Sequence, residues 1–140
     1  MEALVPNLES VRNGASPEPT ILVVDDDEHV RRALKRVLRR ASSRVLDATD
    51  ACSALPILER EPVQVVVSDY RMPGMSGVEL LREVKRRWPR IQRVLLTGQA
   101  DSSAIEEAVN QSEIFRFIWK PWDDGHLLIT IQDAITQFVT

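Results

Sequence analysis

The sequence predicts an α/β fold, a three-layer sandwich in which helices cover both faces of a five-stranded parallel sheet. Short runs rich in Val, Ile and Leu alternate with longer amphipathic segments, and this strand–helix alternation occurs five times. Several of the apolar runs end abruptly in polar residues or in a Pro-Gly turn, which is typical of buried strands that reach the edge of a sheet. An alternation of strands and helices of this kind forms parallel strands joined by right-handed crossovers.

Composition limits the class of protein. The 140 residues suffice for one domain with a core of its own. A formal net charge of −3 and a pI of about 5.4 argue against nucleic-acid binding. The single cysteine, Cys52, fits a reducing compartment, so we expect a cytoplasmic location, and we expect this side chain to be buried. No apolar run approaches the roughly 20 residues of a membrane span, and no signal peptide is recognisable.

The first half of the chain predicts an extension, two strands and two helices. Prolines and a glycine among polar residues indicate a flexible N-terminal extension over 1–19, with the domain proper over 20–140. A strand over 20–24 precedes an amphipathic helix over about 27–41. A second strand at 44–48 leads to a helix over about 50–61, in which Pro56 should cause a kink or delay the start.

The second half continues the alternation. The expected strands are 63–68, 91–96 and 114–118, and the expected helices end near 88, span about 101–111 and span about 122–138. The last helix should turn four apolar residues towards the core: Leu128, Ile131, Ile135 and Phe138.

Polar residues stand where the predicted strands end. Asp25, Asp26 and Asp27 follow the first strand, Asp69 ends the third, and the fourth and fifth are followed by Thr97 and Lys120. The carboxyl ends of parallel strands meet at one edge of a sheet, where ligands bind. The sequence therefore predicts that carboxylates, a hydroxyl and an ammonium gather there.

This set of groups indicates a particular chemistry. Two carboxylates about 4 Å apart repel by roughly 4 kcal/mol at an effective dielectric near 20. A hard divalent cation removes that repulsion, and carboxylates with waters and a phosphate make a typical Mg²⁺ site. Lys120 and Thr97 are suited to phosphoryl oxygens, so the set indicates phosphoryl transfer to a carboxylate. We assign Asp27 to the cap of the following helix instead.

Four motifs resemble those of a two-component response-regulator receiver domain. Ile21-Leu22-Val23-Val24-Asp25-Asp26 resembles the acidic-pair motif, and the stretch from Val67 to Gly77 resembles the phosphoacceptor motif. Leu95-Leu96-Thr97-Gly98 resembles the hydroxyl motif, and Lys120-Pro121 the lysine motif. The resemblance covers about residues 20–138, with the motifs in the family's order and spacing.

The resemblance implies a flavodoxin-like sheet with strand order 2-1-3-4-5. It implies phosphorylation of Asp69, with a phosphohistidine of a histidine kinase or phosphotransfer protein as donor, or acetyl phosphate in its place. It also implies a phosphoacceptor signalling domain and not an enzyme, since such a domain catalyses only its own phosphorylation and dephosphorylation. Mg²⁺ would be bound by Asp26 and Asp69 and the backbone carbonyl of Arg71, with Asp25 acting mainly through a metal-bound water.

The resemblance also implies a switch and partners. Thr97 and Phe117 would be the switch residues, changing a surface built by the fourth helix, fifth strand and fifth helix. That surface would act on an output domain, a partner protein or a second copy in a homodimer, without nucleic-acid or membrane contact by this domain. The segment from Lys120 to Asp124 resembles receivers fused to cyclic-dinucleotide enzymes.

Two alternatives come from other classes. A haloacid-dehalogenase-type enzyme would use Asp25 and Asp27 as nucleophile and acid, but that motif normally continues to Thr or Val where this chain has His29. A pseudo-receiver would only bind proteins, and it would be expected to lack part of the acidic pair, the acceptor or the lysine. The sequence leaves open whether the receiver stands alone or is a fragment.

Overall fold

The computed structural model describes residues 18–41, 44–98, 106 and 116–139, and these form a parallel sheet flanked by helices. The strands are β2 (Thr20–Val24), β3 (Arg44–Ala48), β4 (Val65–Asp69), β5 (Gln92–Thr97) and β6 (Arg116–Trp119). The helices are α1 (Glu28–Arg39), α2 (Ala51–Arg60), α3 (Gly77–Arg87) and α5 (Asp124–Val139). The helix expected at about 101–111 lies outside the described residues, and so do residues 1–17 of the extension expected over 1–19.

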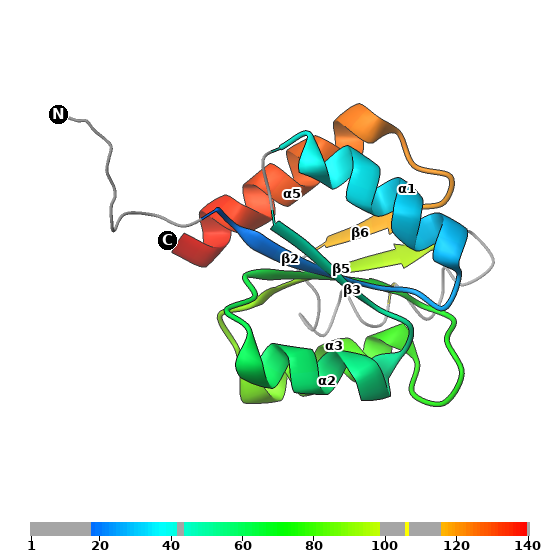
Figure 1. Ribbon diagram of the computed structural model, residues 1–140, viewed down its shortest axis with the longest axis vertical. Coiled ribbons are helices and arrows are strands. Elements are labelled where there is room, and N and C mark those ends of the chain that lie inside the picture. The colour runs from blue at the N-terminus through cyan, green and yellow to red at the C-terminus, as the bar shows by residue number, and fades with distance from the viewer. Residues whose placement is uncertain (1–17, 42–43, 99–105, 107–115, 140) are drawn as a thin grey trace, which may run out of the picture.

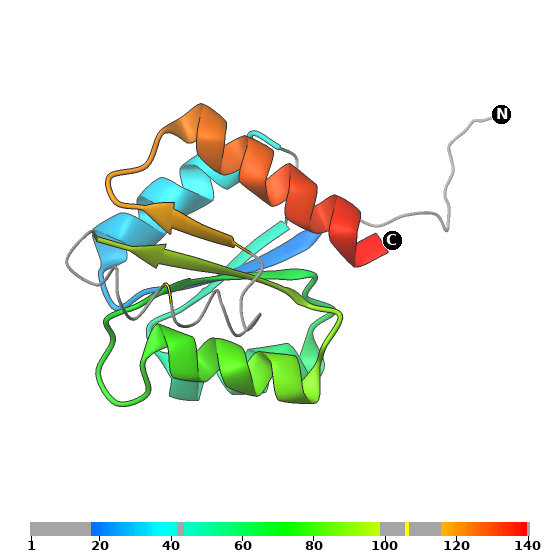
Figure 2. The same cartoon turned by 180° about the vertical axis from the view of Figure 1, so that it is seen from behind.

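The strands follow the order β3-β2-β4-β5-β6, all parallel. Numbered along the chain this is 2-1-3-4-5, so the expected fold class and strand order are confirmed. Helices α1 and α5 cover one face of the sheet, and α2 and α3 lie on the other (Figures 1 and 2). The chain runs from β2 to its neighbour β3 on one side and then returns past β2 to β4 on the other side, so β2 and β4 lie next to each other at the topological switch point of the sheet.

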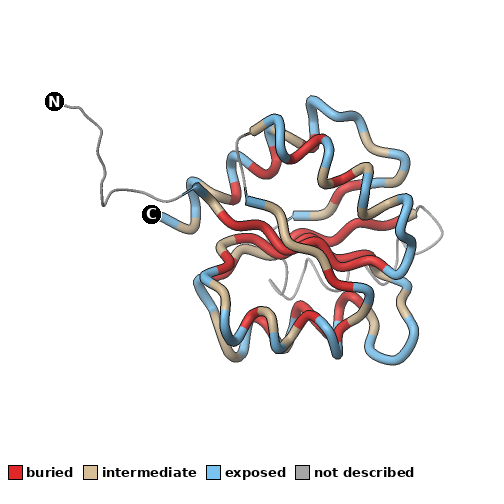
Figure 3. The backbone as a smooth tube through the Cα atoms, in the orientation of Figure 1, coloured by how far each residue is buried: buried red, intermediate tan, exposed pale blue. Residues whose placement is uncertain are grey.

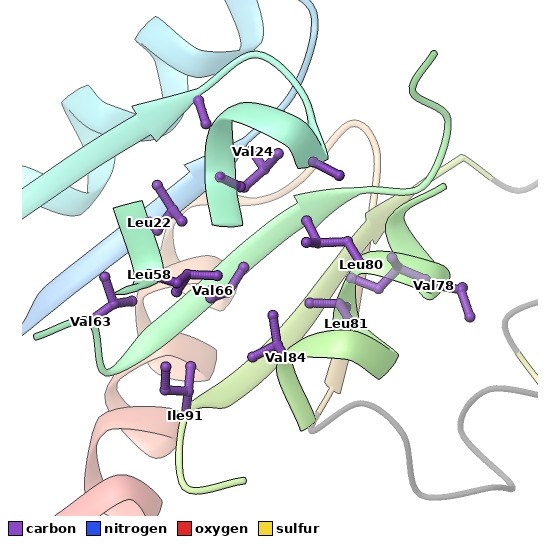
Figure 4. Close-up of a cluster of buried hydrophobic side chains, with 14 residues drawn as sticks. Leu22, Val24, Leu58, Val63, Val66, Val78, Leu80, Leu81, Val84 and Ile91 are labelled. Atoms are coloured by element: carbon purple, nitrogen blue, oxygen red, sulfur yellow. The ribbon is translucent and has the colours of Figure 1, made fainter. Parts of the chain in front are cut away.

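Two apolar clusters hold the layers together. Because successive side chains of a strand point to opposite faces, Leu22 and Val66 pack against α2 and α3 while Ile21 and Val65 pack on the other side. Figure 4 shows the first cluster, where Leu80, Leu81 and Val84 of α3 meet the sheet. The buried stretches run through the central strands, and the exposed ones lie on the outer helix faces (Figure 3). The central strands therefore form a fixed frame for the residues that follow them.

Side-chain caps fix where α1 and α3 begin. Asp27 accepts hydrogen bonds from the backbone N–H groups of His29 and Val30, at 2.8 and 3.4 Å, which confirms its expected role as a helix cap. Ser76 and Glu79 form a reciprocal capping box at α3. Both helices start directly beside the strand ends that carry the acidic residues.

One expectation about α2 is wrong, and one of the two alternatives for Pro56 is excluded. Cys52 is exposed, because the face of the helix towards the sheet is made by Ala51, Ala54 and Leu58. Pro56 does not delay the helix, which begins at Ala51 after its cap, Asp50. Pro56 lies on an exposed part of α2.

The inner face of α5 is rotated from the expected one. Its buried residues are Leu127, Thr130, Ile131 and Ala134. Of the expected set only Ile131 is fully buried, and Leu128, Ile135 and Phe138 are partly exposed. The helix packs through two large residues, Leu127 and Ile131, together with Thr130 and Ala134, and the buried hydroxyl of Thr130 donates to the His126 carbonyl at 2.9 Å. Among the described residues, no helix is both long and apolar enough to span a bilayer.

Candidate functional site

Three carboxylates meet at the edge of the sheet where β2 and β4 end. Oxygens of Asp25, Asp26 and Asp69 all lie within 4.8 Å of one another. Asp25 is completely buried and Asp69 is 8% exposed, whereas Asp26 is exposed to solvent. They border a cleft of about 370 Å³, whose remaining lining residues are Asp27, Arg71, Gly98 and Lys120. The sequence prediction that acidic groups gather at this edge is confirmed.

Lys120 connects two of these carboxylates. Its Nζ lies 2.9 Å from Asp69 Oδ1 and 3.4 Å from Asp25 Oδ2. The backbone sets this position, because the Lys120 N–H donates to the Thr97 carbonyl at 2.7 Å and so aligns the end of β6 with that of β5. Three acids and one ammonium leave the cluster with a formal charge of −2. A divalent cation would balance that charge.

The Asp25 carboxylate is fixed from two directions. Its Oδ1 accepts the Asp27 N–H at 2.8 Å, and its Oδ2 accepts from Lys120. Burial raises the pKa of Asp25; the Asp27 N–H lowers it, the Asp69 charge adds to the rise, and Lys120 opposes it. Burial alone would lower the pKa of Lys120, but its hydrogen bonds and charge interactions with the two carboxylates outweigh burial and raise it. The ammonium form of Lys120 is therefore stabilised in the cleft.

The remaining sequence-predicted residues lie at different distances from the acids. Arg71 lines the cleft. Thr97 is buried, and its hydroxyl donates to the Gly98 carbonyl at 3.2 Å. Phe117 is half-buried against the α2/α3 cluster, and its ring meets Trp119 edge-on, with centroids 5.2 Å apart. Thr97 stands opposite Trp119 in the sheet, so Thr97 and Phe117 are close neighbours on one face of β5 and β6.

Two residues around the cleft were missed by sequence reasoning. Gly77 lies so close to β4 that a Cβ there would be 2.1 Å from the Asp69 carbonyl oxygen. Arg31 of α1 donates to the Asp25 carbonyl at 2.7 Å. Gly77 ends the stretch that resembles the phosphoacceptor motif, but that resemblance does not reveal its contact with Asp69, and Arg31 belongs to no motif. Both contacts depend on tertiary packing.

The donor set fits Mg²⁺. All three side chains offer hard oxygen ligands, and the exposed Asp26 leaves room for waters and for an incoming phosphoryl oxygen. Lys120 supplies a fixed positive charge next to Asp69. An ammonium in this position can balance the negative charge of a phosphoryl oxygen. The cleft therefore combines three carboxylates that could hold a cation with an ammonium group, within one small volume.

The chain is similar to known proteins in sequence and in structure. The family model of the response regulator receiver domain matches residues 21–132. The hydrogenase transcriptional regulatory protein HoxA of Cupriavidus necator is 43% identical over 118 residues, which are 84% of this chain and 24% of that protein. The DNA-binding transcriptional regulator NtrC of Escherichia coli K12 is 31% identical over 118 residues, covering 84% of this chain and 25% of NtrC. The chain thus spans about a quarter of the length of these curated relatives.

Solved structures agree with the family match. The signal receiver domain of an HD domain-containing protein from Pseudomonas fluorescens Pf-5 superposes with a TM-score of 0.84 at 34% identity, covering 95% of both chains. A response regulator receiver domain protein from Clostridium thermocellum gives a TM-score of 0.80 at 30% identity, over 85% of this chain and 95% of that one.

Proposed function

Because this chain belongs to the response regulator receiver domain family, we propose that Asp69 accepts a phosphoryl group from the phosphohistidine of a histidine kinase or phosphotransfer protein. The observation that carries the proposal is the position of Lys120, which contacts both Asp69 and Asp25 in a cleft lined by acids. Receiver domains belong to signalling regulators and are not a family of classical enzymes. The reaction proposed here modifies the domain itself.

The transfer is a substitution at phosphorus. An Asp69 carboxylate oxygen forms the new O–P bond while the P–N bond to the donor histidine breaks, and the electron pair of that bond remains on the imidazole nitrogen. Lys120 stabilises the negative charge on the phosphoryl oxygens. The Thr97 hydroxyl, 3.2 Å from the Gly98 carbonyl, would exchange this hydrogen bond for one to the phosphoryl group.

Asp26, Asp69 and the backbone carbonyl of Arg71 would hold Mg²⁺, with Asp25 acting mainly through a bound water. The cation supplies charge neutralisation: it offsets repulsion among the carboxylates and between Asp69 and the donor's phosphate. Asp25 supports this role from its buried position, because its carboxylate is already oriented by the Asp27 N–H and Lys120.

Signal output would follow from a change around Thr97. We expect Thr97 to move towards the phosphoryl oxygens, and Phe117 to move into the volume behind it, altering the surface built by the fourth helix, β6 and α5. The fourth helix of this surface lies outside the described residues. The phosphorylated surface would then act on an output domain, a partner protein or a second copy of the chain.

Two of the comparisons support an output domain as the target of this surface. HoxA and NtrC are transcriptional regulators of which the matched segment makes up only 24% and 25%, so an output domain within a longer regulator fits. One of the similar receivers belongs to an HD domain-containing protein, so an HD domain is a second kind of output domain that fits. We propose that this domain itself does not bind nucleic acid or membrane and that it works in the cytoplasm.

The dehalogenase alternative is wrong, because the receiver family model covers residues 21–132 and Asp27, its supposed acid, is engaged as the α1 cap. The other alternative, a pseudo-receiver that only binds proteins, is tested by the following experiment. The chain is incubated with acetyl phosphate and its intact mass is measured with Mg²⁺ and with excess chelator. A gain of one phosphoryl group only in the presence of Mg²⁺ supports the proposal, and an unchanged mass in both conditions would favour a protein-binding pseudo-receiver.

A further inference from the structure

Arg31 of α1 reaches back to the turn that carries the acidic pair. Its Nη1 donates to the Asp25 carbonyl at 2.7 Å, and its Nε donates to Asp47 Oδ2 at 3.0 Å. The Arg31 side chain is only 13% exposed, so both bonds are shielded from water. Asp47, on the neighbouring strand β3, also accepts from Lys35 at 3.3 Å. Figure 1 shows α1 starting at the edge of the sheet where β2 ends.

The Asp25 carbonyl belongs to the peptide unit that joins Asp25 to Asp26. A peptide unit is planar, so a donor that holds its oxygen also fixes the direction in which the Asp26 N–Cα bond leaves. The Asp25 N–H is held as well, by the Ala48 carbonyl of β3 at 3.1 Å. Because the Asp26 side chain is exposed, little packing holds it, and its position depends on the direction of this backbone.

We propose that Arg31 is a positioning residue of the cation site: it orients the Asp25–Asp26 peptide so that the Asp26 carboxylate faces Asp69. This role rests on the proposed function of the cleft. Asp47 holds the guanidinium in place through a charge-assisted bond and neutralises its charge, so that Arg31 aligns the acids without repelling a bound cation.

Position and charge predict opposite effects when Arg31 is replaced. If Arg31 acted only through its positive charge, removing that charge would tighten binding of a cation. If it acts through the Asp25 carbonyl, removal releases the peptide and weakens binding. The sign of the change therefore separates the two roles.

The test uses Arg31→Met, which keeps the buried aliphatic stem, and Arg31→Lys, which keeps the charge but offers one ammonium for two acceptors. Two control variants also remove a positive charge from α1. Lys35→Met removes the other partner of Asp47, and Arg32→Met removes an exposed residue paired with Glu28. Mg²⁺ affinity is measured by calorimetric titration, each variant's fold is checked by thermal unfolding, and phosphorylation by acetyl phosphate is followed against Mg²⁺ concentration.

We expect Arg31→Met to weaken Mg²⁺ binding by about 10-fold, the scale seen for groups that orient metal ligands. Arg31→Lys should lose less, and both controls should bind as well as wild type or more tightly. The phosphorylation rate of Arg31→Met should need more Mg²⁺ for half-saturation, while its maximal rate stays near that of wild type.

Affinity of Arg31→Met equal to or tighter than that of wild type would overturn the inference and leave the proposed function intact. Should Arg31→Met fail to fold, Arg31→Lys decides in the same way: weakened binding with the charge retained supports a positioning role, and wild-type affinity overturns it. A wild-type chain that binds no Mg²⁺ would overturn the proposed function and the inference with it.

Discussion

Gly77 is the position at which one added methyl group should disturb both the fold and the acceptor. It is the first residue of α3, and its N–H donates to the Tyr70 carbonyl at 2.9 Å. In Gly77→Ala, the new Cβ would lie 2.1 Å from the Asp69 carbonyl oxygen, 2.9 Å from its carbon and 3.0 Å from Leu95 Cδ1. Two of the three atoms are backbone, so a rotamer change cannot relieve the clash.

The expected size of the effect follows from two opposing terms. Overpacking of this kind costs about 1–3 kcal/mol. Replacing Gly by Ala in a helix returns up to about 1 kcal/mol. We therefore expect a net loss of about 1–2 kcal/mol, or about 4–8 °C in Tm for a domain of this size. The Asp69 backbone must also move by about 1 Å, and such a misplacement of a reacting group can lower a rate by about 100-fold.

The assay compares Gly77→Ala with Gly125→Ala, a glycine in the first turn of α5. There the nearest atom to a new Cβ is Asp123 Oδ2, at 3.2 Å, which belongs to a side chain and would have to shift by only a few tenths of an ångström. Thermal unfolding and the rate of phosphorylation by acetyl phosphate are measured for both. We expect Gly125→Ala to match wild type and Gly77→Ala to lose both stability and rate. Wild-type Tm and wild-type rate in Gly77→Ala would refute the argument that α3 is pressed against the acceptor strand.

Three further outcomes are expected. Asp26→Ala should weaken Mg²⁺ binding by at least about 10-fold, whereas Asp27→Ala should leave the affinity unchanged and cost about 1 kcal/mol as a lost helix cap; equal losses of affinity in titration would contradict this. Because burial raises the pKa of Asp25 above 3.8, the folded state binds the proton more tightly than the unfolded state, and wild type loses stability as pH rises through that window. The side chain in Asp25→Asn does not titrate, so the stability of this variant relative to wild type should rise as the pH rises above 3.8. A difference between the two melting temperatures that does not change with pH, measured without Mg²⁺, would argue against this. Amide hydrogen exchange over residues 97–138 should change when beryllofluoride mimics the phosphoryl group, because we expect a two-state shift around Phe117. Moving such an equilibrium from 1:99 to 99:1 takes roughly 5.5 kcal/mol, and unchanged protection throughout would indicate a passive phosphate sink.

Much of the site could be predicted from the sequence because it depends on strand ends. Asp25, Asp69 and Lys120 each follow an apolar run, and parallel topology brings those ends together whatever the details of packing. Asp27 was separable from its neighbours because its position in the first turn suits a cap. These inferences use only local patterns and the direction of the strands.

What could not be predicted depends on how helices rotate against the sheet. The periodicity of α5 allowed several neighbouring faces, and the observed one includes Thr130, a polar residue that can be buried because its hydroxyl bonds to its own helix. The exposure of Cys52 follows from a similar choice in α2. The contact of Gly77 with Asp69 joins residues on separate elements, and a sequence of this length carries no local trace of it.

The most direct test of the central claim is to locate the phosphoryl group. After treatment with acetyl phosphate and Mg²⁺, the acyl phosphate is reduced with borohydride, and the modified residue is identified by peptide mass spectrometry, with Asp69→Asn treated in parallel. We expect modification at Asp69 alone and no gain of mass in Asp69→Asn. Modification at Asp25 or Asp26, or a full gain of mass in Asp69→Asn, would contradict the account.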